Sequence, residues 1–388
     1  MQQALLFIVL IILGLYILLI LYYWMSWLTI PVFNSTNQNS RLKISVIIPA
    51  RNEEKNIAIC LDSINHQTYD KDLFEVIVVD DHSTDNTADI IKNHPLQNLK
   101  LIALKDFISD EINSYKKKAI EIAIAQSTAE LIITTDADCI VPEKWLETIA
   151  AFYNQHQPQF IAAPVSINCS FKFIEMFQAL DFAMLQGITA ASVHKKIHSM
   201  CNGANLAYSK KAFLAVDGFK GIDTIASGDD MLLMHKIYKQ YPVKVMFLKS
   251  SDVIVQTEPV YTLKEFFNQR IRWASKADKY DDKRIFAVLL LVYLVNFLLV
   301  AMPVMAAFTN VPFTIANLTL SLWQLWLWLL LLKTLVELVF LYPVAIFFGK
   351  QKLLWIFPLM QPFHILYTVI AGWLGKFGKY NWKGRNIK

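Results

Sequence analysis

The chain has 388 residues, 55% of which are hydrophobic, and its mean hydropathy is +0.37. This composition excludes a single ordinary soluble domain. The formal net charge of +5 is small, and basic residues gather beside the apolar segments, which fits a membrane surface and argues against nucleic acid as a partner.

The first apolar segment, residues 4–30, contains no charged residue, and the first charge in the chain is Arg41. At about 1.5 Å per residue, a helix of this length crosses a hydrocarbon core of ~30 Å. A cleaved signal peptide is the alternative, but the segment lacks a basic start and exceeds the usual apolar length. We therefore expect residues 1–40 to form a transmembrane anchor and a linker.

Residues 41–260 have the pattern of an α/β domain. Short β-rich segments alternate with helical ones, which predicts βαβ units and a parallel sheet with right-handed crossovers. The expected strands are 44–48, 74–79, 99–104, 131–135, 160–165 and 205–209, and the expected helices are 55–65, 87–93, 116–126, 171–192 and 231–241. Ligands of such sheets bind beyond the carboxyl ends of the strands.

Polar residues follow three of these strands. They are Pro49-Ala50-Arg51-Asn52-Glu53-Glu54, then Asp80-Asp81-His82-Ser83-Thr84-Asp85, and Asp136-Ala137-Asp138. Carboxylates gathered at one sheet edge repel one another unless a cation or hydrogen-bond donors lie between them. The pattern therefore indicates a ligand site.

Asp136 and Asp138 are two residues apart, so their carboxylates point to the same side if the strand geometry persists. Two such oxygen ligands suit Mg2+ or Mn2+, which also accepts oxygens from a substrate diphosphate. Aspartates also serve as helix caps and turn residues, but the position after an apolar strand favours a metal site.

Two further acidic pairs have alternative roles. Asp80 and Asp81 either form a strand-end turn or also contact a nucleotide. In Ser227-Gly228-Asp229-Asp230, one carboxylate can act as a general base for an acceptor hydroxyl. Capping of the following helix is the rival role. One arrangement has Asp229 as the cap and Asp230 as the base, but spacing alone does not separate the two.

Residues 261–284 form an amphipathic segment before the second apolar region and contain Gln269-Arg270-Ile271-Arg272-Trp273. One interpretation is an interfacial helix with basic residues and a tryptophan anchor. The interpretation we favour assigns Arg270 and Arg272 to a donor diphosphate and Trp273 to stacking on an acceptor sugar.

Together these motifs resemble the membrane-bound branch of the family 2 glycosyltransferases of GT-A fold. The resemblance implies a Rossmann-like α/β domain with a mixed, mainly parallel sheet flanked by helices. The resemblance covers about residues 43–279, and five motifs occur in the expected order. It implies donor contacts, metal contacts and acceptor contacts at the following positions. The implied donor contacts are Pro49, Arg51, Asn52, Glu53, Asp80, Asp81, Lys117, Asp136, Arg270 and Arg272. The implied metal contacts are Asp136 and Asp138. The implied acceptor contacts are Asn202, Gly203, Asn205, Gln269 and Trp273.

The resemblance also makes Asp230 the preferred base, with Asp229 as the alternative. One departure is Tyr115-Lys116-Lys117, where the family often has Gly-Lys. Because that glycine is missing, the sequence leaves the placement of the two lysines open.

Residues 285–388 form a C-terminal transmembrane block and a basic tail. Expected spans are 285–307, a segment within 320–348, and 353–374. Lys333 and Glu337 are four residues apart and can pair within the bundle. Four crossings would put the basic tail outside, so either residues 311–348 cross twice or the proline-containing segment 353–374 lies in the interface; we favour the second.

The expected function is the metal-assisted, inverting transfer of a sugar from a nucleotide-sugar donor to a lipid-linked or glycan acceptor. We expect the donor to be a UDP-sugar and the protein to lie in a cell inner membrane. Nucleotide sugars are cytoplasmic, so we expect the α/β domain on that side, with its four cysteines reduced. A processive polysaccharide synthase is the alternative, and a non-catalytic membrane scaffold is a third. The sequence does not specify the sugar or the acceptor.

Overall fold

The computed structural model describes residues 2–35, 40–108, 112–197, 200–225, 227–275, 282–309, 312–315, 318–377, 380–382 and 385–387. The chain divides into two compact units. The α/β unit comprises Ile30–Cys169 and Thr189–Pro259, and the helical unit comprises Met1–Thr29, Ser170–Ile188 and Val260–Lys388. Residues 170–188 thus belong to the helical unit, whereas the sequence grouped them with the α/β domain.

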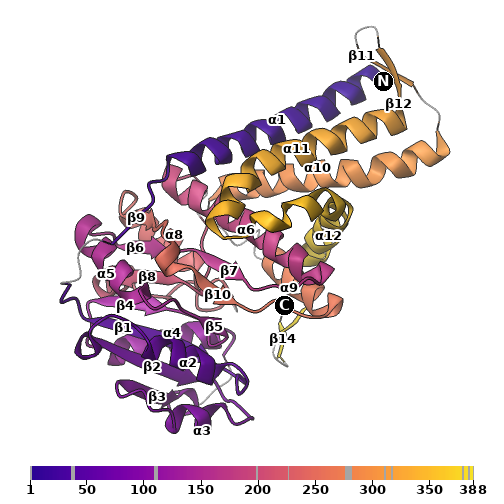
Figure 1. Cartoon of the computed structure of the whole chain (residues 1–388). Helices are drawn as coiled ribbons and strands as arrows, with labels where there is room; N and C mark the ends of the chain where they lie inside the picture. The colour runs from indigo at the N-terminus through magenta and orange to yellow at the C-terminus, as the bar shows by residue number, and fades with distance from the viewer. Residues whose placement is uncertain are drawn as a thin grey trace. The chain divides into compact units, whose positions relative to one another are not determined.

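The α/β unit follows the alternation predicted from the sequence (Figure 1). Its elements are β1 (Ile44–Ala50), α2 (Ile57–Asn65), η1 (Lys71–Leu73), β2 (Phe74–Asp80), α3 (Thr87–Lys92), β3 (Leu99–Ala103), η2 (Leu104–Asp106), α4 (Tyr115–Gln126), β4 (Leu131–Thr134), β5 (Cys139–Ile140), α5 (Trp145–His156), β6 (Phe160–Ala162), β7 (Val165–Ile167), β8 (Leu206–Ser209), α7 (Lys210–Ala215), α8 (Met231–Gln240), β9 (Val245–Phe247), η3 (Ser251–Val253) and β10 (Val255–Thr257).

Seven strands form one mixed sheet in the order β3-β2-β1-β4-β8-β6-β9. The first four are mutually parallel, and β8 is antiparallel to both β4 and β6. A second sheet has the order β5-β10-β7. The fold class is therefore the mixed, mainly parallel α/β class that the sequence predicted.

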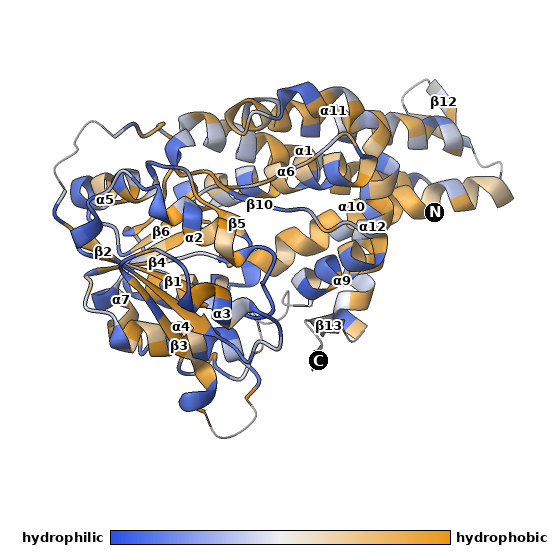
Figure 2. Cartoon of the chain, turned by 60° about the horizontal axis from the view of Figure 1, so that its bottom comes forward, coloured by the Kyte–Doolittle hydropathy of each residue, from blue (hydrophilic) through white to orange (hydrophobic). Residues whose placement is uncertain are grey.

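The central strands are apolar along nearly their whole length because both faces of the sheet are covered. All four residues of β4 are buried, as are six of the seven in β1. Figure 2 shows these two strands largely in the hydrophobic colour. Helix α4 packs against β1 and β2, which brings its first residues to the edge where these strands end.

The single strand expected at 160–165 is instead two strands in different sheets, β6 and β7. Pro164 lies between them, and proline cannot donate a ladder hydrogen bond. Its carbonyl instead accepts from the backbone N–H of Val255, at 3.1 Å. The chain therefore changes sheets at this residue.

The helical unit contains long apolar helices and two short hairpins. Its elements are α1 (Gln2–Thr29), α6 (Phe173–Lys195), α9 (Leu263–Ala274), α10 (Lys283–Phe308), β11 (Pro312–Ile315), β12 (Leu318–Ser321), α11 (Leu322–Phe347), η4 (Gln351–Ile356), α12 (Phe357–Phe377), β13 (Tyr380–Trp382) and β14 (Arg385–Ile387). Helices α1, α10 and α11 pack side by side, and α12 packs against α9 and α10.

Among the described residues, four helical segments are long and apolar enough to cross a membrane. They are Leu6–Thr29, Lys283–Phe308, Leu322–Phe347 and Gln351–Phe377. Residues 322–347 form a single helix preceded by the β11–β12 hairpin, so the alternative in which 311–348 crosses twice is wrong. The interfacial location of 353–374 stays a prediction, and the basic tail lies mostly outside the described residues.

A charged network lies inside the helical unit. The Lys333 ammonium is 2.7 Å from the Glu337 carboxylate, which confirms the predicted pair, and both side chains are buried. Gln361 of α12 accepts from Lys333 at 2.8 Å and donates to Glu337 at 2.6 Å. Tyr16 of α1 also donates to Glu337. The network therefore joins α1, α11 and α12 through hydrogen bonds.

Candidate active site

The parallel strands β1, β2 and β4 bring their polar loops to one edge of the large sheet. Ala50, the last residue of β1, is in register with Asp80, the last residue of β2. Ile47 of β1 is in register with Thr134, after which the chain enters Thr135 and Asp136. The clustering of the three motifs that was predicted from their strand-end positions follows from this register.

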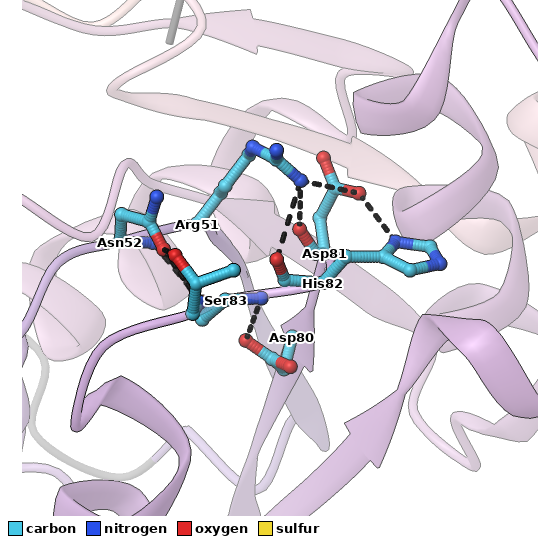
Figure 3. A network of polar contacts seen from close by, with 7 residues as sticks. Arg51, Asn52, Asp80, Asp81, His82 and Ser83 are labelled. Atoms are coloured by element: carbon cyan, nitrogen blue, oxygen red, sulfur yellow. Dashed lines mark hydrogen bonds and ion pairs between the residues drawn. The ribbon is translucent and has the colours of Figure 1, made fainter. Parts of the chain in front are cut away.

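The loops after β1 and β2 bind each other through the network in Figure 3. The Arg51 guanidinium donates to the backbone carbonyl of Asp81 at 2.8 Å and lies 3.8 Å from its carboxylate. The same carboxylate oxygen lies 3.0 Å from His82 Nδ1. Arg51 and Asp81 thus hold the two loops together from one side.

Asn52 joins the same loops from the other side. Its backbone N–H donates to Ser83 Oγ at 3.0 Å, and its side-chain oxygen accepts from the Thr84 N–H at 2.8 Å. Both Asn52 and His82 have positive φ, of 52° and 56°. Left-handed backbone at a non-glycine residue costs about 1 kcal/mol or more, and such residues cluster at functional sites.

Glu53 and Asp80 complete this pair of loops. The Glu53 backbone N–H donates to Thr87 Oγ1 at the start of α3, at 2.8 Å, and the Asp80 carboxylate accepts from the Ser83 N–H at 3.3 Å. Asp80 therefore forms the strand-end turn that was one of its two predicted roles. Pro49 lies within β1 and is partly exposed.

Lys116 is the central residue of the second half of the site. Its ammonium is 2.7 Å from the Asp136 carboxylate and 3.2 Å from that of Asp229. Burial lowers the pKa of Lys116, but Asp136 and Asp229 outweigh it and hold the pKa above its ordinary value. An ammonium thus lies between carboxylates from two different loops, which satisfies the need for a positive charge among them.

Asp138 lies beside two buried thiols. Cys139 Sγ is 3.7 Å from the Asp138 carboxylate, and Cys60 Sγ is 3.8 Å from the backbone oxygen of Asp136. Burial raises the pKa of Cys60, and the nearby charges of Asp138, Asp136 and Glu53 raise it further. These two cysteines are buried free thiols.

The donor set suits a divalent cation that is shared with a substrate. Among the described residues, no three side chains of His, Cys, Asp or Glu converge to form a complete metal site. Two carboxylates, Asp136 and Asp138, are the kind of partial site in which Mg2+ or Mn2+ takes its remaining ligands from water and phosphate. The Lys116 ammonium on Asp136 further indicates that this carboxylate attracts cations.

Asp229 and Asp230 face different partners. Asp230, not Asp229, caps α8: its carboxylate accepts from the Met231 N–H at 2.7 Å. Its second oxygen accepts from the Gly203 N–H at 3.2 Å. The arrangement in which Asp229 provides the cap is wrong, because Asp229 turns toward Lys116 instead.

Gly203 lies within the same cluster. A Cβ atom placed on it would be 3.3 Å from the Lys116 ammonium and 3.4 Å from the Asp229 carboxylate. Both contacts are tight, so the absence of a side chain lets residues 202–204 approach the two charges. The preceding residue, Asn202, is partly exposed and accepts from the Ala204 N–H at 2.9 Å.

Asn205 does not face this cluster. It is fully buried, and its amide donates to the carbonyls of Pro164 and Val253 at 2.8 and 2.7 Å. Its oxygen accepts from Trp145 Nε1 at 3.0 Å. The structure therefore corrects the assignment of Asn205 to the acceptor, since both ends of its amide are used inside the core.

Lys117 also differs from its predicted role. Its side chain is buried, and its ammonium donates to the backbone carbonyls of Ile222 and Ser227 in the loop before Asp229. The structure places its neighbour Lys116 at the carboxylates instead. The sequence signal for Lys116 was the run of three lysines, Lys116 to Lys118, at a helix start, where consecutive side chains face different directions.

Gln269, Arg270, Arg272 and Trp273 all lie on α9 in the helical unit. The Arg270 guanidinium is buried, 2.8 Å from the Asp181 carboxylate, and lies 4.3 Å from the centre of the Trp273 ring. The predicted donor contact of Arg270 is corrected accordingly: its charge is already paired with Asp181 inside its own unit. Gln269, Arg272 and Trp273 are partly exposed.

The fold and the carboxylate-lined sheet edge define a glycosyltransferase of GT-A type. The family model for Glycosyl transferase family 2 matches residues 45–216. The family model for Glycosyl transferase family group 2 matches residues 131–342, and this second match covers more than half of the chain. The protein belongs to the glycosyl transferase family group 2, which confirms the resemblance seen in the sequence.

Similar proteins include two from Staphylococcus aureus. The poly(ribitol-phosphate) beta-N-acetylglucosaminyltransferase TarS is 37% identical over 30% of this chain and 19% of its own length. A poly-beta-1,6-N-acetyl-D-glucosamine synthase is 25% identical over 60% of this chain and 53% of its own. The chain thus spans only about a fifth and about half of these two relatives.

A solved structure has the same fold over nearly the whole chain. It is the mannosyltransferase PcManGT from Pyrobaculum calidifontis, in complex with GDP-Man and Mn2+. The two proteins are 19% identical, the match covers 94% of this chain and 99% of that one, and the TM-score is 0.55. At this identity the likeness establishes the fold.

Proposed function

We propose that the protein is an inverting glycosyltransferase that moves a sugar from a nucleotide-sugar donor to a lipid-linked or other membrane-associated acceptor. The observation that carries the proposal is the cluster of Asp136, Asp229 and Asp230 around Lys116, in a chain that belongs to a glycosyltransferase family. The acidic loops bind a phosphate-bearing donor only with positive charge between them, and Lys116 supplies part of that charge.

In this proposal the loops after β1 and β2 bind the nucleotide. Arg51 and Asp81 are cross-linked, and Asn52 and His82 have strained backbones, so the subsite is formed before a ligand arrives. Asp80, Glu53 and Pro49 lie along the same two strand ends. Both relatives named above carry N-acetylglucosamine in their names, which supports a UDP-sugar as donor.

Asp136 and Asp138 would hold a divalent cation together with the donor diphosphate. When bound, the cation offsets the negative charge that develops on the departing nucleotide diphosphate. Lys116, 2.7 Å from Asp136, adds a fixed positive charge on the same side.

The general base in the proposed reaction is Asp230. The acceptor hydroxyl oxygen forms a bond to the anomeric carbon, the bond from that carbon to the diphosphate oxygen breaks, and the hydroxyl proton moves to the carboxylate. Each Asp230 oxygen accepts one backbone N–H and retains a second lone pair. Asp229 is the weaker candidate because Lys116 already engages its carboxylate.

The proposed acceptor contacts are Asn202, Gly203, Gln269 and Trp273, and Arg272 is a proposed donor contact. The four candidate spans support a membrane-embedded protein whose acceptor is delivered by the membrane. Nucleotide sugars are cytoplasmic, so we propose that the α/β unit faces the cytoplasm of a cell whose inner membrane holds the helices. The expected products are cell-envelope glycolipids or polysaccharides.

A processive polysaccharide synthase is the second candidate, and the relative that makes poly-beta-1,6-N-acetyl-D-glucosamine favours it. Incubating membranes with a panel of labelled nucleotide sugars distinguishes the two. Label in the lipid extract supports single transfer, and label in insoluble polymer supports the synthase. No incorporation from any donor would favour a non-catalytic membrane scaffold and refute the proposal.

Variants of the acidic residues test the roles within the site. We expect Asp138→Asn to abolish metal-dependent turnover, and Asp230→Asn to stop transfer while nucleotide binding is retained. Asp89→Asn is the control, because this carboxylate is 76% exposed on α3. If Asp229→Asn stops transfer and Asp230→Asn does not, the base is the other aspartate.

A further inference from the structure

The loop between α7 and α8 carries the proposed base at its end. It runs from Val216 to Asp230, and the structure describes all of it except residue 226. Asp217, Gly218, Gly221 and Gly228 all have positive φ, between 49° and 84°. Backbone turn hydrogen bonds form within the loop, from the Lys220 N–H to the Asp217 carbonyl and from the Ile222 N–H to the Phe219 carbonyl, both at 3.0 Å. Side chains from outside the loop add further contacts to its second part.

Lys117 of α4 binds the part of the loop that precedes the two aspartates. Its ammonium donates to the carbonyls of Ile222 at 2.9 Å and Ser227 at 3.0 Å, and also to that of Ile225. An ammonium has three N–H donors, which is enough to bind all three carbonyls. The residue is only 2% exposed, which means that the bonds form in an environment with little competing water.

A second contact from the same helix start reinforces the first. Ser114, the residue before α4, donates its hydroxyl to the carbonyl of Asp223. Ser114 is also buried. Together the two side chains at the start of α4 contact four carbonyls within residues 222–227.

The adjacent lysine acts on the very next residues. Ser227 is followed by Gly228, with φ of 81°, and then by Asp229, whose carboxylate is 3.2 Å from Lys116. Lys117 therefore holds the backbone before the two aspartates, and Lys116 holds a side chain of that pair. Consecutive residues on one helix point about 100° apart, which allows one to reach the loop backbone and the other the carboxylates.

We propose that Lys117 is a positioning residue that holds the 222–230 segment so that Asp229 and Asp230 lie correctly in the site. This inference rests on the proposed function, since it concerns the base of that reaction. It gives Lys117 a role distinct from donor binding: the residue acts through backbone carbonyls and touches neither substrate nor cation.

The chain offers a matched control on the same loop. Lys236 of α8 donates to the carbonyls of Gly218 and Lys220, at 2.6 and 2.7 Å. It is a second lysine that binds this loop through backbone oxygens, but at the end far in sequence from Asp229. Lys236→Met therefore removes the same chemistry without releasing the segment that carries the base.

The test compares Lys117→Met and Lys236→Met in the full-length protein in detergent. Three readouts are measured: turnover with the donor found by the labelling panel, binding of UDP and GDP in the presence of Mn2+, and amide hydrogen exchange across residues 216–230. For Lys117→Met we expect turnover to fall about 100-fold, as for a displacement of about 1 Å, with nucleotide affinity unchanged and faster exchange over 222–230. For Lys236→Met we expect faster exchange near 218–220 and turnover close to that of the wild type.

Three outcomes would overturn the inference. The first is that Lys117→Met keeps full turnover although its amide exchange is faster. The second is that amide exchange over residues 222–230 is the same in Lys117→Met and in the wild type. The third is that Lys117→Met loses nucleotide binding together with turnover, which would assign Lys117 to the donor site. If Lys117→Met fails to fold, Ser114→Ala provides a milder release of the same segment and should lower turnover without changing nucleotide affinity; unchanged turnover would count against the proposal.

Failure of the proposed function has a different signature. The wild-type protein would then bind neither nucleotide and turn over no donor. The exchange comparison of the two lysine variants would still decide whether Lys117 holds the segment.

Discussion

Replacing Lys116 with methionine should destabilise the α/β unit and make it more responsive to a divalent cation. The substitution removes the positive charge that lies 2.7 Å from Asp136 and 3.2 Å from Asp229, and leaves these two carboxylates facing each other. At an effective dielectric constant of about 20, the Coulomb attraction of each lost ion pair is roughly 4 kcal/mol at a separation of 4 Å, before the cost of desolvating the charges is subtracted. Because Lys116 and Asp136 are 24% and 36% exposed, water screens much of this, and we expect a net loss of about 2 kcal/mol.

Thermal unfolding of the full-length protein, with and without MnCl2, measures both effects. A loss of this size should lower the transition temperature by roughly 4–8 °C for a unit of this length. Added Mn2+ should recover more stability in Lys116→Met than in the wild type, because the ion no longer competes with the ammonium for Asp136.

Lys118→Met is the matched control for this experiment. Lys118 lies on the same helix and pairs with Glu121 at 2.8 Å, but both side chains are at least 40% exposed, so its loss should cost less than about 1 kcal/mol. Equal Mn2+ shifts in the wild type and Lys116→Met, or equal destabilisation by the two methionine variants, would refute the reasoning.

Three further predictions concern buried polar groups. Asn205→Ala removes three core hydrogen bonds and should lower the free energy of unfolding by about 3 kcal/mol in denaturant titrations; a loss below about 1 kcal/mol would contradict its structural role. Asp181→Leu leaves Arg270 buried and unpaired and should cost about 3 kcal/mol, much of which Arg270→Met in the same protein should restore; no recovery in the double variant would argue against the pair. Burial lowers the pKa of Lys249 to about 8, so this lysine opposes folding while it is protonated. Lys249→Met should therefore stabilise the protein by up to about 3 kcal/mol below pH 8, and the gain should shrink as the pH rises from about 8 toward about 10.5; a gain independent of pH would exclude this cause.

The sequence predicted the main sheet and its polar edge because both depend on local patterns. Strands β1, β2 and β4 are short apolar runs that end in polar or acidic motifs, and parallel strands bring such ends together. The Lys333 and Glu337 pair was predictable for the same reason, since residues four apart on a helix are neighbours. These features require no knowledge of contacts between distant segments.

The roles of neighbouring residues could not be predicted in this way. Lys116 and Lys117 have the same chemistry and adjacent positions, and only the packing of α4 on the sheet decides which of them faces the carboxylates. The same holds for Asp229 and Asp230, whose directions are set by the left-handed turn at Gly228. Asn205 lies near the site in sequence, but its amide is needed by carbonyls of two distant segments.

The buried network around Glu337 has a consequence for biosynthesis. A lysine or an acidic residue near the centre of an inserting helix costs about 3 kcal/mol at the translocon, and α11 carries one of each. Pairing the two lowers that cost, and Tyr16 lowers it further by donating to Glu337. Because α1 is synthesised first, its tyrosine is available when α11 leaves the ribosome, whereas Gln361 arrives later. We therefore expect integration of α11 to be less efficient when Tyr16 is replaced by phenylalanine, so that the first helix acts as an assembly partner for a helix synthesised much later in the chain.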